Sequence, residues 1–366
     1  MVCDYLVCHR APVHNLAVNP EAAWEPDFCG RLLSTMEAHA LALGWNAWAD
    51  IEATYVDVCS RHNLVQICSA AAPNLSFHQH VRAQAALTQT RAGPDGLRLE
   101  KAVYVTFCQT DGDALHSMCN LQQGHWDSAY RGSVPFGWQI APRLAFDLGP
   151  ALLEYYYRTL TPNDCVVLGP SGIGYNYPSV YPDLDGYLRR TAQALEVTDT
   201  DCIWVINRVV RHGDPGYVIH RTSSGEVPIP VRDGVLNEQI KNQYGADWVD
   251  ESVAERYFQQ CPQLIGCFQG FETIPREEDR LVMGKPWVPT KVMVDSPEQG
   301  LRDIAGYAEG RRLPVFVAAT VNMCGPMNER MFEKLLTLVP RLRALGYKIV
   351  RPDEFLLLRR KALQEQ

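Results

Sequence analysis

The sequence lacks the features that would place the protein in a membrane or on a nucleic acid. It contains no run of about eighteen apolar residues, which is the length that a membrane-spanning helix needs. It also lacks a stripe of basic residues, and its 34 Lys and Arg are outnumbered by 42 Asp and Glu, for a net charge of −8. The composition therefore predicts a protein that binds neither nucleic acid nor a membrane surface.

The cysteine patterns of metal sites and of secreted scaffolds are also missing. The 12 cysteines form no C-x-x-C pair and no Cys/His cluster at zinc spacing, and most lie in apolar runs, which favours buried free thiols over disulfides. The first residues lack the basic and apolar regions of a signal peptide. We therefore expect a cytoplasmic protein, with a trimmed secreted form as the alternative.

The glycine-rich segment 169–178 lacks three familiar catalytic patterns. No Lys-Ser/Thr follows it, its glycine spacing does not fit a dinucleotide site, and Ile173 stands where a nucleophile elbow needs glycine. Its glycines permit close approach of a ligand, and its tyrosines offer flat faces with hydroxyl tips. We expect it to contact a ligand, with a tight structural turn as the alternative; the residues concerned are Ser171, Gly172, Gly174, Tyr175 and Tyr177.

The chain does contain many short apolar runs separated by amphipathic stretches. The runs predict strands at 2–8, 63–69, 101–108, 134–140, 164–169, 201–207, 263–268, 288–294, 313–320 and 346–350. Most are continuously apolar, as in strands covered on both faces. Ser296 to Gln299 form a capping box that begins one of the intervening helices.

This order of elements predicts an α/β fold. We expect a TIM-like (β/α)7 or (β/α)8 barrel that need not be regular, with an irregular excursion at 208–250, and we expect residues 1–366 to form a single catalytic domain. Two doubly wound domains are the alternative.

In such a barrel the functional side chains lie at the C-terminal ends of the strands. Asp111 and Asp113 follow the strand at 101–108, and Glu272 follows the strand at 263–268. Paired carboxylates can act as general acid and base, or bind a divalent cation. A turn with a helix cap is the alternative for Asp111 and Asp113.

Aromatic and amide side chains follow other strands. Trp138 and Gln139 end the strand at 134–140, Asn207 ends that at 201–207, and Asn322 follows that at 313–320, while Trp126 lies in the loop after the Asp pair. Aromatic rings stack on the apolar faces of sugars, and amides bind their hydroxyls. We therefore predict a carbohydrate substrate, bound by Trp126, Trp138, Asn207 and the glycine-rich segment.

Three segments resemble the GxGYxYP family of putative glycoside hydrolases: TDGDALHSM, HWDSAYRGSVPFGWQIAP and DLGPALLEYYYRTLTPNDCVVLGPSGIGYNYP. The naming motif is complete from Gly172 to Pro178, the resemblance covers roughly residues 102–190, and PNLSFHQHV at 73–81 is similar to an upstream segment. The resemblance implies a barrel-type C-terminal domain and hydrolysis of glycosides, commonly in secreted bacterial proteins of polysaccharide utilisation. Ala114 departs from the family, where Asn is frequent at this position.

The leading hypothesis is therefore a glycoside hydrolase without a cofactor, acting on a poly- or oligosaccharide through a pair drawn from Asp111, Asp113 and Glu272. One alternative is a polysaccharide deacetylase with a divalent cation at Asp111 and Asp113. Another is a non-catalytic glycan-binding barrel. The sequence does not decide the oligomeric state.

Overall fold

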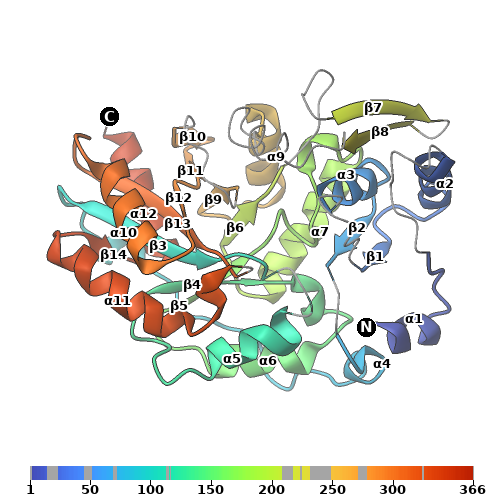
Figure 1. Ribbon diagram of the computed structural model, residues 1–366, viewed down its shortest axis with the longest axis horizontal. Coiled ribbons are helices and arrows are strands. Elements are labelled where there is room, and N and C mark those ends of the chain that lie inside the picture. Colours follow the sequence, from blue (N-terminus) through green and yellow to red (C-terminus); the bar gives the residue numbers. More distant parts are fainter. Residues whose placement is uncertain are drawn as a thin grey trace.

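The fold combines helices with one large, mostly parallel sheet (Figure 1). The computed structural model describes residues 2–14, 24–44, 52–68, 72–112, 115, 117–207, 217–222, 225–230, 249–270, 278–323 and 325–365. The N-terminal helices lie at one end of the molecule and the C-terminal helices at the other end (Figure 1).

The large sheet is built from strands that match eight of the predicted apolar runs or their flanks. Its strands are β3 (Val103–Gln109), β4 (Phe136–Ile140), β5 (Asp164–Leu168), β6 (Cys202–Val205), β9 (Gly266–Gln269), β10 (Arg280–Val282), β11 (Lys285–Pro289), β12 (Val292–Val294), β13 (Val315–Val321) and β14 (Lys348–Ile349). Their order is β10-β11-β9-β6-β5-β4-β3-β13-β12, with β14 beside β3. The β10–β11 pair is antiparallel and the others are parallel.

Helices separate most of these strands along the chain. They are α1 (Cys3–Cys8), α2 (Trp24–Leu33), α3 (Glu52–Arg61), α4 (Leu75–His78), α5 (Gln122–Trp126), α6 (Pro150–Arg158), α7 (Leu184–Val197), α9 (Glu251–Gln260), α10 (Pro297–Ala308), α11 (Met331–Ala344) and α12 (Pro352–Gln364). The predicted capping residue Ser296 accepts a hydrogen bond from the Gln299 N–H and begins α10.

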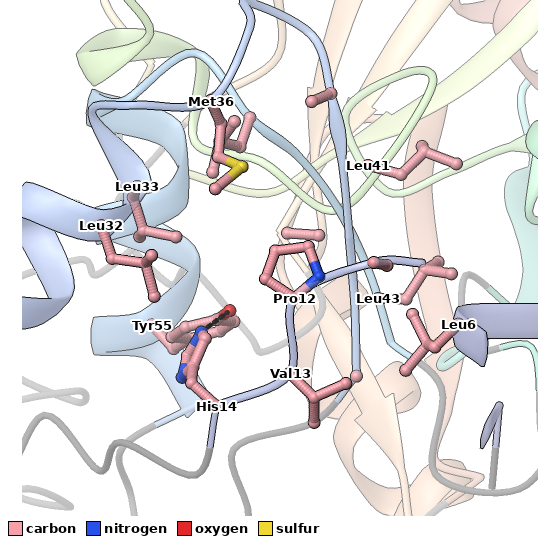
Figure 2. A pocket seen from close by; sticks show the side chains of 15 residues that line it. Leu6, Pro12, Val13, His14, Leu32, Leu33, Met36, Leu41, Leu43 and Tyr55 are labelled. Carbon is pink, nitrogen blue, oxygen red and sulfur yellow. Dashed lines mark hydrogen bonds between the residues drawn. The ribbon is translucent and has the colours of Figure 1, made fainter. Parts of the chain in front are cut away.

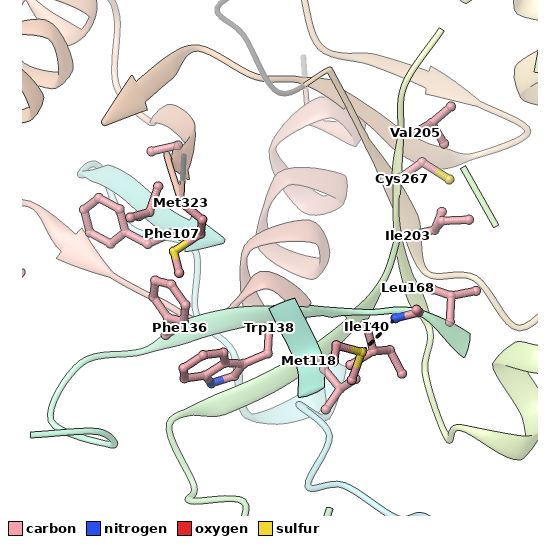
Figure 3. Packing of buried hydrophobic residues seen from close by; sticks show 14 of the residues in the cluster. Phe107, Met118, Phe136, Trp138, Ile140, Leu168, Ile203, Val205, Cys267 and Met323 are labelled. Atoms are coloured by element: carbon pink, nitrogen blue, oxygen red, sulfur yellow. Dashed lines mark hydrogen bonds between the residues drawn. The ribbon is translucent and has the colours of Figure 1, made fainter. Parts of the chain in front are cut away.

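The two faces of the sheet pack against different partners, because successive side chains of a strand point to opposite faces. On one face, side chains such as Tyr104, Trp204 and Phe268 pack against Phe355 of α12. We call this the α12 face. The opposite face carries a larger apolar cluster that gathers side chains from several strands, including Phe107, Phe136, Trp138 and Ile203 (Figure 3).

The expected closed TIM-like barrel is not confirmed. Within the described residues, the hydrogen-bonded path ends at β10 on one side and at β12 on the other. Only Thr290 and Lys291 separate β11 from β12, yet β11 pairs with β9 and β12 pairs with β13. We call Thr290–Lys291 the seam.

A buried ion-pair network occupies the seam. Lys291 Nζ lies 2.9 Å from Asp279 Oδ1, and Arg359 Nε of α12 donates to Asp279 Oδ2 at 2.6 Å. The Lys291 and Asp279 side chains are 1% and 4% exposed. Through Asp279, salt bridges therefore connect the seam to α12.

The N-terminal part contains one error of the sequence prediction. Residues 2–8, expected to be a strand, form helix α1, whose Asp4 accepts hydrogen bonds from the backbone and hydroxyl of Ser76. A short apolar run fits a strand and a buried helix equally well. The predicted strand at 63–69 is confirmed as β2 (Val65–Ile67), which pairs with β1 (Leu41–Leu43) in a separate parallel sheet.

Only part of the expected excursion at 208–250 lies within the described residues. There the chain forms an antiparallel hairpin of β7 (Tyr217–Thr222) and β8 (Gly225–Pro230). No helix in the described ranges is long and apolar enough to cross a bilayer. The prediction of a single domain stays a prediction, although Tyr5 and Val65 share one core cluster with the large sheet.

Candidate functional site

Four polar side chains stand in register across the C-terminal ends of four neighbouring strands. Val294 pairs with Val321, Val321 with Gln109, and Cys108 with Gly137. Continuing this register past the strand ends aligns the residues that follow or close β12, β13, β3 and β4. By the alternation of side chains they face α12. We call them the polar row: Asp295, Asn322, Thr110 and Gln139.

Asp295 is held at both its backbone and its side chain. Its N–H donates to Gln299 Oε1 of α10 at 2.8 Å, and its Oδ1 accepts a hydrogen bond of 2.7 Å from Asn322 Nδ2. A carboxylate that accepts an amide N–H has its negative charge stabilised. Asp295 is half-buried, so this charge stays within reach of solvent.

Thr110 is the next member of the row, and Asp111 lies beside it. The Thr110 hydroxyl oxygen accepts from the Met323 N–H at 3.0 Å, and the hydroxyl donates to the Asp111 carboxylate. Asp111 is half-buried and has a left-handed φ of 61°. A Cβ on Gly112 would lie 2.2 Å from the Gln139 carbonyl oxygen, so only glycine fits at this position.

Gln139 carries a buried carboxamide with unused hydrogen-bonding capacity. The residue has no exposed surface, and within the described ranges neither its Oε1 nor its Nε2 has a nitrogen or oxygen partner. It adjoins the thiol of Cys108, whose pKa is raised by burial and lowered to a lesser extent by this contact. Leaving an amide buried and unpaired costs about 1–3 kcal/mol. Such a group indicates a bound water or ligand.

The remaining predicted carboxylates cannot be placed. Asp113 and Glu272 lie outside the described residues, so the expected pairing with Asp111 and the expected cation site remain predictions. Within the described ranges no group of three or more His, Cys, Asp or Glu is arranged to hold a metal. His125 of α5 has its Nε2 2.8 Å from Asn328 Oδ1.

The Gly172–Pro178 motif is buried against the N-terminal part instead of facing a ligand. The Tyr175 N–H donates to the Gln66 carbonyl at 2.8 Å. Asn176 Nδ2 donates to the Leu64 carbonyl at 2.7 Å, and Asn176 Oδ1 accepts from the Gln66 N–H at 3.3 Å. The motif thus adds hydrogen bonds along β2 and docks the N-terminal part on the large sheet.

The two tyrosines of the motif also differ from the prediction. Tyr175 and Tyr177 are 5% and 0% exposed and contact each other edge to face. The Tyr177 N–H donates to Ser60 Oγ at 2.9 Å. Their rings pack with Ile206 and residues of the N-terminal part, so they do not present faces for sugar stacking.

Three predicted ligand contacts instead bind or pack against neighbouring parts of the chain near the strand ends: Ser171, Gly172 and Asn207. Ser171 Oγ donates to the Ile206 carbonyl and accepts from the Ile206 N–H, which extends the contact between β5 and β6. Gly172 has φ +145°, and a Cβ there would lie 2.4 Å from Thr191 Oγ1. Asn207 Oδ1 accepts from the Ser179 N–H. All three residues are buried, in contrast to the predicted ligand contacts.

Trp126 and Trp138 likewise belong to the core. They are 2% and 0% exposed, with ring centroids 4.8 Å apart. Trp138 Nε1 donates to Asp164 Oδ1 and Trp126 Nε1 to Thr159 Oγ1. The expected sugar-stacking role does not fit these positions, because along β4 it is Gln139, not Trp138, that points to the α12 face.

Asp295 was not among the predicted residues, and Gln139 and Asn322 were predicted at strand ends without being assigned to the site. Asp295 directly follows the apolar Val292–Val294 and precedes the capping Ser296. The rule that selected Asp111, a polar residue at a strand end, applies equally to this position. What the sequence could not supply was the register that places the row on one face.

A separate cavity of about 190 Å³ lies in the N-terminal part (Figure 2). Its lining is mostly apolar and comes entirely from residues 6–64. His14 Nε2 lies 3.5 Å from Tyr55 Oη, and burial lowers the pKa of His14. No member of the polar row lines this cavity.

Comparisons with known proteins match two parts of the chain to one family. Residues 101–360 match the GxGYxYP putative glycoside hydrolase C-terminal domain, and residues 1–80 match the GxGYxYP third domain. A crystal structure of a putative hydrolase from Bacteroides thetaiotaomicron VPI-5482 is similar in fold, with a TM-score of 0.72 and 20% identity. The match covers 94% of this chain and 61% of that one, so this chain spans about three fifths of that protein's length. No curated protein matches the sequence.

Proposed function

This chain belongs to the GxGYxYP family, and we propose that it is a hydrolase of glycosidic bonds in a poly- or oligosaccharide. The observation that carries the proposal is the polar row beside Asp111 at the C-terminal edge of the sheet. In α/β proteins built on parallel strands this edge is where ligands bind. Carboxylate, hydroxyl and amide groups are the partners that sugar hydroxyls need.

Hydrolysis of a glycosidic bond needs two carboxyl groups. One protonates the leaving oxygen, and the other activates water or attacks the anomeric carbon. Asp111 supplies one carboxyl group in this proposal, and its sequence neighbour Asp113 and Glu272 are the partners that the strand-end pattern predicts. No cofactor takes part.

We also infer that the sheet curls into a TIM-like barrel around α12. Two observations support this. The single segment 285–294 pairs with β9 at one end of the strand order and with β13 at the other. In addition, side chains from β3, β5, β6, β9 and β13 all reach one cluster with α12. Such a barrel brings the polar row and the ends of β6 and β9 around one mouth.

The test is a screen of the purified chain on 4-methylumbelliferyl glycosides and on acetylated and plain polysaccharides. We expect release of sugar, and we expect Asp111→Asn to lower kcat by about 10²–10⁴-fold, the usual contribution of a general acid or base. Asp95→Asn, an exposed carboxylate in a turn, is the matched control.

Other outcomes of this screen would overturn the proposal. Release of acetate that stops with a chelator would indicate the deacetylase. Binding of a glycan without turnover, unchanged in Asp111→Asn, would indicate a glycan-binding module.

A further inference from the structure

We propose that Asp295 is a second catalytic carboxylate of this site, the general base, and that Asn322 is its positioning residue. The assignment rests on the proposed glycoside hydrolysis. It replaces Asp113 and Glu272 as the partner of Asp111, and it comes from the tertiary register.

The two carboxylates stand on strands whose spacing suits an inverting enzyme. Asp295 follows β12 and Asp111 follows β3 by two residues, with β13 between the two strands. Neighbouring strands lie about 4.8 Å apart, so the backbones at Asp295 and Thr110 are about 10 Å apart. Carboxyl groups about 6.5–9.5 Å apart leave room for a water beneath the sugar, which is the arrangement of inverting enzymes.

The contacts of Asp295 fix the position of its carboxylate. Asn322 Nδ2 donates to one of its oxygens at 2.7 Å, and the Asp295 backbone is fixed by Gln299. An amide donor holds the carboxylate in one orientation, which a general base needs in order to reach its water. Gly325 lies next to this pair: a Cβ there would be 2.9 Å from Asn322 Nδ2. Glycine at this position therefore provides the space in which the Asn322 amide contacts Asp295.

Gln139 gives independent evidence of a bound water or ligand at the same edge of the sheet. Gln139 is fully buried on the same face, and within the described ranges its carboxamide lacks nitrogen or oxygen partners. Glycines adjoin it on two sides: Gly112 packs on its backbone, and a Cβ on Gly169 would lie 3.3 Å from its Oε1. The unpaired Gln139 carboxamide therefore indicates a bound water or ligand beneath the row, at the opposite end from the half-buried Asp295 carboxylate.

The proposed hydrolysis uses water as its only co-substrate. A water molecule attacks the anomeric carbon, and its proton passes to the Asp295 carboxylate. The bond between the anomeric carbon and the leaving oxygen breaks, and that oxygen takes a proton from the Asp111 carboxyl group. The product sugar carries the inverted configuration.

The experiment uses the full chain and the glycoside or polysaccharide that the screen identifies. We expect Asp295→Asn to lower kcat by about 10²–10⁴-fold, with an unchanged melting temperature. Glu298→Gln, an exposed carboxylate in the first turn of α10, should keep full activity. Proton NMR of the first product should show the inverted anomer. Azide should restore turnover to Asp295→Ala, because it attacks without a base.

Asn322→Ala provides the readout that separates positioning from folding. We expect a roughly 10–100-fold lower kcat with little change in KM, comparable to the loss of other orienting partners. Unaltered activity of Asp295→Asn, or a retained anomeric configuration, would overturn the assignment while leaving glycoside hydrolysis intact. If the wild-type chain hydrolyses no glycoside, both proposals fail.

Discussion

At the residue scale, Gly174 allows the family motif to pack closely against β2 because it has no side chain. A Cβ at this position would be 2.6 Å from both the Gln66 carbonyl oxygen and Val65 Cγ1 of β2. Gly174→Ala must therefore push the motif away from β2, and we expect a loss of about 1–3 kcal/mol, as for other overpacked sites. Hydrogen exchange of residues 55–68, together with denaturant unfolding, measures both effects.

The control for this variant is Gly306→Ala. Gly306 lies within α10, and a Cβ there would meet nothing within 4 Å. Alanine should stabilise the helix by about 0.5–1 kcal/mol relative to glycine. Equal exchange rates at 55–68 in Gly174→Ala and the wild type would contradict the docking role of the motif.

At the scale of elements, the buried ion pairs of Asp279 stabilise the seam between β11 and β12. Asp279 is the shared anion of Lys291 and Arg359, and its side chain is 4% exposed. Asp279→Asn removes the anion that Lys291 and Arg359 share, and we expect a loss of about 3–5 kcal/mol in the free energy of unfolding. Urea denaturation measures it.

An exposed ion pair on α11 serves as the comparison. Glu333 lies 3.6 Å from Arg330, whose side chain is 79% exposed. Glu333→Gln should change the free energy of unfolding by less than about 1 kcal/mol, because solvent screens such pairs. An equally small effect of Asp279→Asn would show that the seam is held by packing alone.

At the scale of the whole molecule, the stability of the N-terminal part should depend on pH. Burial lowers the pKa of both His14 and His62 below the ordinary value of 6.5. Between the folded and unfolded values the unfolded chain binds more protons. The stability of the folded state is therefore fully present above pH 6.5 and falls as the pH decreases toward the folded values.

Limited proteolysis at pH 7.5 and 5.5 tests this dependence. We expect faster cleavage within residues 1–68 at pH 5.5, and a smaller difference between the two pH values in the double variant His14→Gln/His62→Gln. His80→Gln, an exposed histidine on the neighbouring turn, should behave as the wild type. Equal cleavage at both pH values in the wild type would contradict the effect of burial.

The sequence predicted the elements better than it predicted the site. Nine of the ten predicted strands lie at or beside observed strands, because a buried parallel strand requires a continuous apolar run. The exception, residues 2–8, formed α1 because the same run fits a buried helix. Aromatic residues were a poor guide to the site: Trp138 was expected at the end of a strand and Tyr177 in the loop after one, yet both are fully buried.

By itself, the sequence determined the α/β class, the family and the strand ends at which Asp111 stands. These depend on local apolar patterning and on a contiguous motif, both of which can be read along the chain. The tertiary structure alone decided which side chains share a face. Asp295, Asn322 and Gln139 lie far apart in sequence, and only the register of β12, β13, β3 and β4 aligns them. The same long-range packing places the motif against β2. Its close contact with Gln66 leaves no space for a ligand there.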